Sequence, residues 1–243
     1  MLKDKKDAIV GCNGSGFNLE KNWEPAENSI LRLTKTPWNM RSAGNLVLTD
    51  GKVMRALKNT NGVELKTSGE IGILPNGSLK LYAGTTYDKV INDGVKNTFK
   101  FTSYPLIVDG KVYSNIQDTD EYPRTCVGQI DANNFIILQC DNYTHHSSLK
   151  GMAKIGQKLN CKSLYNFDGG GSTTLWIRKL EYWHGGFHES ARPVADALYF
   201  TTTQKYSKAN GTGYDEWGSD YQEDAFDAYT KWADFSMEKY YSD

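Results

Sequence analysis

Short apolar runs separated by turn-forming pairs dominate the first half of the chain. Asp-Gly or Asn-Gly stands at 50–51, 76–77 and 109–110, each time between two apolar runs. Such pairs are strong hairpin signals because type I′ turns need positive φ at both central residues. The pattern therefore predicts three β-hairpins, and the runs 126–130 and 135–140 predict a fourth.

Two stretches show helical spacing instead. Over 149–159 the apolar residues fall near one helix face, while lysines repeat every fourth position on another. A shorter helix is expected over 85–93, with Thr85 or Thr86 as its N-cap and Gly94 at its end. With the hairpins, these helices predict an α+β fold: a mixed, largely antiparallel β-sheet built from several hairpins, with a few packed helices.

Four further apolar runs predict strands that are not part of these hairpins. They lie at 8–12, 164–167, 175–177 and 192–200. The segment 20–40 carries tryptophans and prolines without a clear period, so it is expected to be a long loop. Loops of that length in compact domains are often functional.

Composition narrows the class of protein. A chain of 243 residues with 39% apolar residues can bury a sizeable core. Its net charge of -1, without a basic cluster, argues against a general nucleic-acid binder. No apolar run approaches the ~20 residues of a membrane helix, and the charged residues 1–7 do not resemble a signal peptide. The location is left open between virion-associated and cytoplasmic.

The cysteines and histidines do not predict a metal site. The sequence contains no C-x-x-C, which disfavours a thiolate zinc site. Cys126 and Cys140 are expected on adjacent strands of one hairpin, with free buried thiols as the favoured state. His184 and His188 are four residues apart but flank two glycines, which disfavour the helix that would pair them. No metal and no cofactor are expected.

The composition changes at Gly211. Residues 214–243 hold nine acidic residues against two lysines, and apolar residues recur with rough helical spacing over 220–241. The predicted organisation is a main domain, 1–210, and an acidic, aromatic helical appendage, 211–243. The appendage is expected to cover apolar surface, with docking and homo-oligomerisation as the alternatives.

The most unusual stretch connects the predicted strands 164–167 and 175–177. It contains Asp168, three consecutive glycines and then three hydroxyl-bearing residues. Three glycines in a row cost backbone entropy and add no packing. We therefore expect bare backbone to approach a ligand with polar oxygens. The alternative is a tight turn in which glycine supplies only positive φ.

Polar residues elsewhere could meet this loop. Asn13 and Gly14 follow the first strand in a glycine-rich segment. Arg124 and Asp141 are expected at the open end of the fourth hairpin, because strand residues equidistant from a turn are neighbours. A functional site is one interpretation. In the alternative interpretation, Asn13 belongs to a structural turn, and Arg124 and Asp141 form a structural ion pair.

Several segments resemble the phosphodiester glycosidase family. Residues 166–172, Asn-Phe-Asp-Gly-Gly-Gly-Ser, resemble its Asn-Leu-Asp-Gly-Gly-Gly-Ser signature. Residues 13–17 are similar to its Asn-Gly-Gly-x-Phe opening, with one glycine fewer, and 106–111 to its hairpin ending in Gly-Lys. Residues 124–128 and 192–194 follow in the family's order. The resemblance covers about residues 8–200.

The resemblance implies hydrolysis of a sugar-1-phosphodiester, which releases the sugar from the phosphate. The site must then hold phosphate charge and stabilise an oxocarbenium-like centre. Three residues are expected to be catalytic: Asp168, Arg124 and Asp141. The residues expected to bind substrate are Asn13, Gly14, Thr125, Asn166, Gly169, Gly170, Gly171, Ser172, Thr173 and Arg192.

The expected partner is a sugar-phosphate glycan or glycoconjugate. For bacterial or phage members of the family, the resemblance suggests cell-wall or capsular polymers that contain sugar-1-phosphate. The alternative is a non-catalytic glycan-binding module of a phage tail or surface assembly. Release of reducing sugar separates the two.

Overall fold

The computed structural model describes residues 8–19, 40–42, 44–117, 121–140, 147–177, 180–184 and 194–201. Every strand pairing among these residues is antiparallel. Two α-helices accompany the described strands. The fold is therefore β-dominated and antiparallel, as the hairpins predicted, and the described sheets contain no parallel pair that would make them mixed. None of the described helices is long and apolar enough to cross a membrane.

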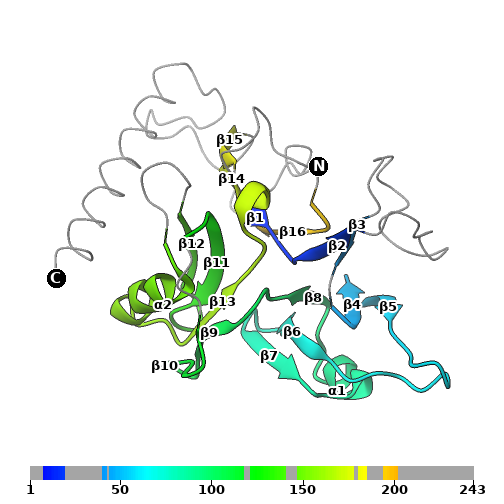
Figure 1. Ribbon diagram of the computed structural model, residues 1–243. Coiled ribbons are helices and arrows are strands. Elements are labelled where there is room, and N and C mark those ends of the chain that lie inside the picture. The colour runs from blue at the N-terminus through cyan, green and yellow to red at the C-terminus, as the bar shows by residue number, and fades with distance from the viewer. Residues whose placement is uncertain are drawn as a thin grey trace, which may run out of the picture. The chain divides into compact units, whose positions relative to one another are not determined.

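The largest sheet has five strands in the order β10-β9-β13-β11-β12 (Figure 1). It contains the third and fourth predicted hairpins, and the strand before the glycine loop lies at its centre. The strands are β9 (Pro105–Val108), β10 (Lys111–Val112), β11 (Arg124–Gln129), β12 (Phe135–Cys140) and β13 (Ser163–Asn166).

A four-stranded sheet has the order β15-β14-β1-β16. The first predicted strand lies in its middle, between strands from much later in the chain. Its members are β1 (Ala8–Asn13), β14 (Thr174–Ile177), β15 (Leu180–His184) and β16 (Ala197–Thr201). Strand β15 was not predicted.

Smaller sheets complete the described structure. Strand β6 lies between β7 and β8, while β4 pairs with β5 and β2 with β3. Strands β2, β3 and β8 were not predicted. The bounds are β2 (Phe17–Leu19), β3 (Met40–Ser42), β4 (Leu46–Thr49), β5 (Lys52–Ala56), β6 (Ser68–Ile73), β7 (Leu79–Ala83) and β8 (Asn97–Lys100).

Two hairpin turns have the backbone expected from their Asp-Gly pairs. Asp50 and Gly51 have φ of 50° and 78°, and Asp109 and Gly110 have φ of 50° and 74°. Both central residues of each turn are thus in the left-handed region, as a type I′ turn requires.

The Asn-Gly hairpin uses a different turn. Gly77 has φ of 83°, but Asn76 is not among the residues with positive φ. The Gly77 amide donates to Leu74 O at 2.8 Å, and the Leu74 amide donates to Ser78 O at 2.9 Å. This is a three-residue loop with glycine in the left-handed position. Pro75 is its first residue and the second residue of the turn 74–77, a position that suits proline because its φ is fixed near −65°.

Both predicted helices are present. Helix α2 (Leu149–Lys158) packs on the five-stranded sheet (Figure 1), and the Ser148 hydroxyl caps it by accepting from the Gly151 amide at 3.1 Å. Helix α1 (Tyr87–Asn92) begins after Thr86, whose side chain makes no capping hydrogen bond.

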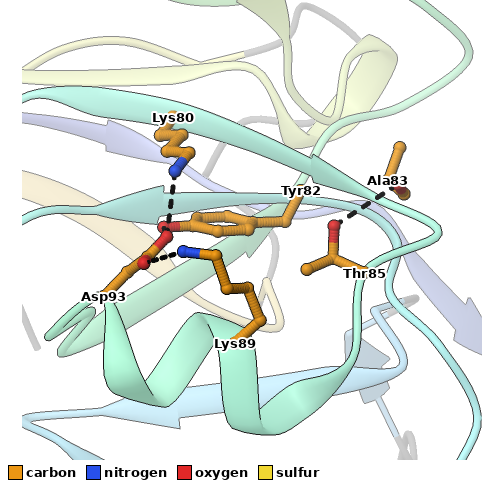
Figure 2. A network of polar contacts seen from close by, with 6 residues as sticks. All are labelled: Lys80, Tyr82, Ala83, Thr85, Lys89 and Asp93. Carbon is orange, nitrogen blue, oxygen red and sulfur yellow. Dashed lines mark hydrogen bonds and ion pairs between the residues drawn. The ribbon is translucent and has the colours of Figure 1, made fainter.

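Helix α1 is fastened to β7 through Asp93 (Figure 2). This carboxylate accepts from Lys80 Nζ and from the Tyr82 hydroxyl, both at 2.9 Å, and from Lys89. Hydrogen bonds from Lys89, Lys80 and Tyr82 hold the pKa of Asp93 well below its usual range. The network positions a helix and lies outside the predicted ligand site.

The five-stranded sheet is buried on both faces. Cys126 and Leu164 belong to a core with helix α2, whereas their neighbours Val127 and Tyr165 belong to a second core. That second core includes Cys12 of β1, so strands of the two larger sheets share it. All four cysteines are free and buried, as expected.

Some predictions concern residues that the structure does not describe. The expected loop 20–40 is described only at Met40. Asp141, Arg192 and the appendage 211–243 also lie outside the described residues. These predictions, and the domain boundary near residue 210, stay predictions.

Candidate active site

The glycine loop begins where β13 leaves the centre of the five-stranded sheet. Asp168 is held there through its main chain: its amide donates to Gly14 O at 2.9 Å, and its carbonyl accepts from Asn13 Nδ2 at 2.6 Å. Residues 170–172 then form a short 3₁₀-helix. The loop that follows the first strand therefore meets the glycine loop, as the sequence interpretation required.

Asn13 is a structural bridge. Its side-chain Oδ1 accepts from Thr125 Oγ1 at 2.7 Å and from the Thr174 amide at 3.0 Å, while Nδ2 donates to Asp168 O. The residue is fully buried. Its amide group is thus committed to β11, β14 and the glycine loop, so it positions Asp168.

Thr125 and Gln139 extend this network between β11 and β12, where they face each other. Gln139 Nε2 donates to Thr125 Oγ1 at 3.0 Å and to Thr174 O at 2.9 Å. Thr125 is fully buried. Gln139 was not predicted as a site residue, because it lies in an apolar run whose sequence indicates only a strand.

The glycine loop also packs against the segment that carries Arg124. The Gly170 amide donates to Pro123 O at 2.8 Å. A Cβ on Gly169 would lie 2.5 Å from Pro123 O and 3.8 Å from Arg124 Cα, so no larger residue fits there without a shift. Arg124 stands beside the half-exposed ring of Tyr122, with Cζ 5.5 Å from the ring centroid.

The hydroxyl residues after the glycines are fully buried or nearly so. Ser172, Thr173 and Thr174 are at most 1% exposed. Thr174 Oγ1 donates to Ser172 O at 3.0 Å. Thr173 Oγ1 has no hydrogen-bond partner within the described part of the chain. A buried hydroxyl without a partner costs about 1–3 kcal/mol, which makes Thr173 a candidate for a water or ligand contact.

Asn166, expected to bind substrate, instead faces the core. Its Nδ2 donates to Thr102 O at 3.0 Å, and its Oδ1 accepts from Cys126 Sγ at 3.7 Å. It is 1% exposed. Both ends of the amide are occupied, so the geometry favours a supporting role.

A second carboxylate, Asp196, was missed in the sequence interpretation. Its Oδ1 accepts from the Ser15 amide at 2.5 Å, and its Oδ2 accepts from Ser15 Oγ at 2.7 Å. Its carbonyl accepts from the Gly14 amide at 3.0 Å. Burial raises the pKa of Asp196 to about 6, the Ser15 hydrogen bonds oppose that rise, and the charge of Asp168 adds to it. The only sequence signal was its place shortly after Arg192.

The structure thus brings several predicted residues together. Asn13, Gly14, Thr125 and the 168–174 segment form one hydrogen-bonded unit, with Arg124 against it. Asp141 and Arg192 lie outside the described residues and cannot be placed in this unit.

Comparisons with known proteins concern the family and the fold of the chain. A family model described as phosphodiester glycosidase matches residues 7–201. The solved catalytic domain of zebrafish N-acetylglucosamine-1-phosphodiester alpha-N-acetylglucosaminidase, auto-inhibited by its pro-peptide, is similar with a TM-score of 0.56 at 16% identity. That match covers 82% of this chain and 65% of the zebrafish chain, so this chain spans just under two thirds of that length.

A second solved structure, from Burkholderia pseudomallei K96243, has a TM-score of 0.51 at 12% identity and covers 82% of this chain and 67% of that one. At these identities the similarity is one of fold. A search of curated proteins found no match.

Proposed function

The chain belongs to the phosphodiester glycosidase family, and we propose that it hydrolyses the glycosidic bond of a sugar-1-phosphodiester. The observation that carries the proposal is the anchoring of Asp168. Both main-chain polar groups of this residue are held by the Asn13–Gly14 segment, at 2.6 and 2.9 Å. The glycine loop that follows it packs on the Pro123–Arg124 segment. A carboxylate and a guanidinium are therefore attached to segments that are hydrogen-bonded and packed against each other.

The proposed ligand consists of a phosphate and a sugar, and each requires different groups in the site. Its phosphate is anionic, and Arg124 can hold two of its oxygens with parallel hydrogen bonds. Within the loop, the Gly170 amide already donates to Pro123 O. The amides of Gly169 and Gly171 are then the backbone donors that we assign to the phosphate. Thr173 Oγ1, buried and without a partner in the described structure, is a further donor for a ligand oxygen.

The proposed reaction breaks the bond between C1 of the sugar and the bridging phosphate oxygen. The electron pair of that bond stays on the phosphate oxygen, and a water oxygen bonds to C1. A phosphomonoester is a far more stable leaving group than a sugar alkoxide, so its protonation is less demanding. Asp168 is assigned to the sugar side, where a carboxylate can take the proton of water, form a covalent intermediate or stabilise positive charge at C1.

Isotope labelling tests the proposal directly. The protein is incubated with alkyl-phosphodiesters of several sugar 1-phosphates in H₂¹⁸O, and the products are analysed by mass spectrometry. Cleavage at C1 places ¹⁸O in the released sugar, whereas cleavage at phosphorus places it in the phosphate. Label in phosphate alone would contradict the proposal. Tight binding without release of sugar from any substrate would instead favour a glycan-binding module.

Two variants test the assigned residues. Asp168→Asn is expected to abolish sugar release while the urea midpoint stays close to that of the parent protein. Arg124→Lys keeps the charge but loses the planar fork, so kcat/KM should fall. Asp88→Asn, at an exposed residue in the first turn of α1, is the matched control and should leave kcat/KM unchanged. Full activity of either site variant would remove that residue from the reaction.

A further inference from the structure

Two aspartates meet at Gly14. The Gly14 amide donates to Asp196 O at 3.0 Å, and the Gly14 carbonyl accepts from the Asp168 amide at 2.9 Å. A single residue thus joins the main chains of both aspartates, although β13 and β16 belong to different sheets. The two carboxylates are close enough that the charge of Asp168 raises the pKa of Asp196.

The Asp196 carboxylate lies directly over Gly14. A Cβ built on Gly14 would be 2.0 Å from Asp196 Oδ1 and 3.1 Å from Phe99 Cδ1. Glycine is therefore required for this carboxylate to reach the Ser15 amide and hydroxyl. Ser15 Oγ in turn accepts from the Lys100 amide at 2.9 Å, so the contact continues to β8.

We propose that Asp196 is the second carboxylate of this site: a positioning residue that holds the Gly14–Ser15 turn against Asp168 and whose negative charge acts on Asp168. This inference rests on the proposed function for its catalytic consequence. The hydrogen-bonded geometry does not depend on it. Asp196 reaches the reacting groups through Gly14, so its effect on the reaction is indirect.

The charged surroundings of Asp196 define how it should titrate. Asp168 at the end of β13 disfavours its ionisation, and Arg55 on β5 favours it. Burial, and to a smaller extent the charge of Asp196, raises the pKa of the Cys12 thiol on β1. The Lys100 ammonium donates to Ser68 O at 2.5 Å and contacts the Phe101 ring, so it is directed elsewhere. With burial as the largest cause, the pKa of Asp196 is raised to about 6, within the range where activity can be measured.

The pH dependence of kcat/KM separates positioning by charge from a merely structural role. The parent protein is expected to show an acid limb with a midpoint near 6. Asp196→Asn removes the ionising group, so that limb should move at least about one pH unit lower, and kcat/KM on the plateau should fall about 10- to 100-fold through misplacement of Asp168. Ser15→Ala keeps the carboxylate but removes a hydrogen bond to its charged form, so the midpoint should move upward.

A lower midpoint of the acid limb in Asp196→Asn, together with a higher midpoint in Ser15→Ala, supports the proposal. Folded variants that lose activity without any change in midpoint would overturn it, as would an Asp196→Asn protein with the parent profile. Near-UV circular dichroism checks folding, and Asp88→Asn is the control for an aspartate on helix α1, which has no part in the hydrogen-bonded unit described above.

An activity-independent measurement distinguishes failure of this inference from failure of the proposed function. Carboxyl carbons of ¹³C-labelled aspartate are followed by NMR during titration. A resonance that titrates near pH 6, is lost in Asp196→Asn and moves to lower pH in Asp168→Asn would establish the pair, even if no sugar phosphodiester is cleaved. A resonance unaffected by Asp168→Asn would refute the pair, even in an active hydrolase.

Discussion

Replacement of Asn13 by alanine would remove the side chain that joins three segments of the site. The change leaves two backbone groups, Asp168 O and the Thr174 amide, without their present partners. The Thr125 hydroxyl also loses its acceptor, although it can rotate and still accepts from Gln139. The perturbation is therefore dominated by two backbone groups that cannot turn away, the buried Thr174 amide and the part-buried Asp168 carbonyl.

The expected destabilisation follows from those two groups. Each buried polar group left without a partner costs about 1–3 kcal/mol, so Asn13→Ala should lower the free energy of unfolding by about 2–6 kcal/mol. That is a large part of a typical stability of about 5–15 kcal/mol. Asn13→Asp should be comparably harmful, because a carboxylate oxygen would then face Asp168 O, where Nδ2 now donates at 2.6 Å.

Urea unfolding followed by tryptophan fluorescence and circular dichroism measures this effect. The midpoint should fall while the m-value stays constant. Asn133→Ala is a suitable control, because Asn133 is exposed and its contact to Asp131 uses the backbone amide. That control should change stability by no more than about 0.5 kcal/mol. A loss below 1 kcal/mol in Asn13→Ala would refute the reasoning that this network is tightly packed.

Other features make separate predictions. Gly169→Ala should lower both the urea midpoint and kcat/KM, because its Cβ would lie 2.5 Å from the Pro123 carbonyl oxygen. A Cβ on Gly170 would meet open space, but the residue has φ of 55°, so Gly170→Ala should lower the free energy of unfolding by only about 1–2 kcal/mol. Asp93→Asn should lower the thermal midpoint without changing kcat/KM, since Asp93 anchors α1. Because the folded-state pKa of Asp93 is lowered, its carboxylate contributes to the free energy of unfolding above its ordinary pKa of 3.8, and this contribution should be lost as pH falls below that value. A difference in stability between parent and variant that does not depend on pH would contradict this. All four buried thiols should react with a thiol reagent only after unfolding, and rapid labelling of the native protein would argue against their burial.

Local chemistry made most of the strands predictable. The turns at 50–51 and 109–110 depend on two residues each, so the Asp-Gly pairs predicted their conformation directly. The turn at 76–77 differed because Pro75 restricts the backbone before it. The pairing of β2 with β3 could not be predicted, because it joins segments separated by a long stretch without a clear pattern.

Local sequence also made part of the site predictable. Asp168 and its glycines stand out in the sequence, and the convergence of Asn13 with them was anticipated. A structural Asn13 was one of the alternatives, but the hydrogen bonds that Asn13 and Asn166 make were not predicted, because a polar residue in the sequence does not reveal its partners. Asp196 was missed because its partner, Ser15, is 181 positions away.

The central position of β1 affects the order in which the protein can assemble. This strand precedes the other described strands in the sequence, yet both of its partners, β14 and β16, follow nearly all of them. The hairpins between them close over short distances and are expected to form early, whereas pairings with large sequence separation form slowly. Asn13 and Gly14 reach Asp168 only when β1 has docked. We therefore expect the candidate site to form after the described hairpins, with activity recovering after most β-structure during refolding.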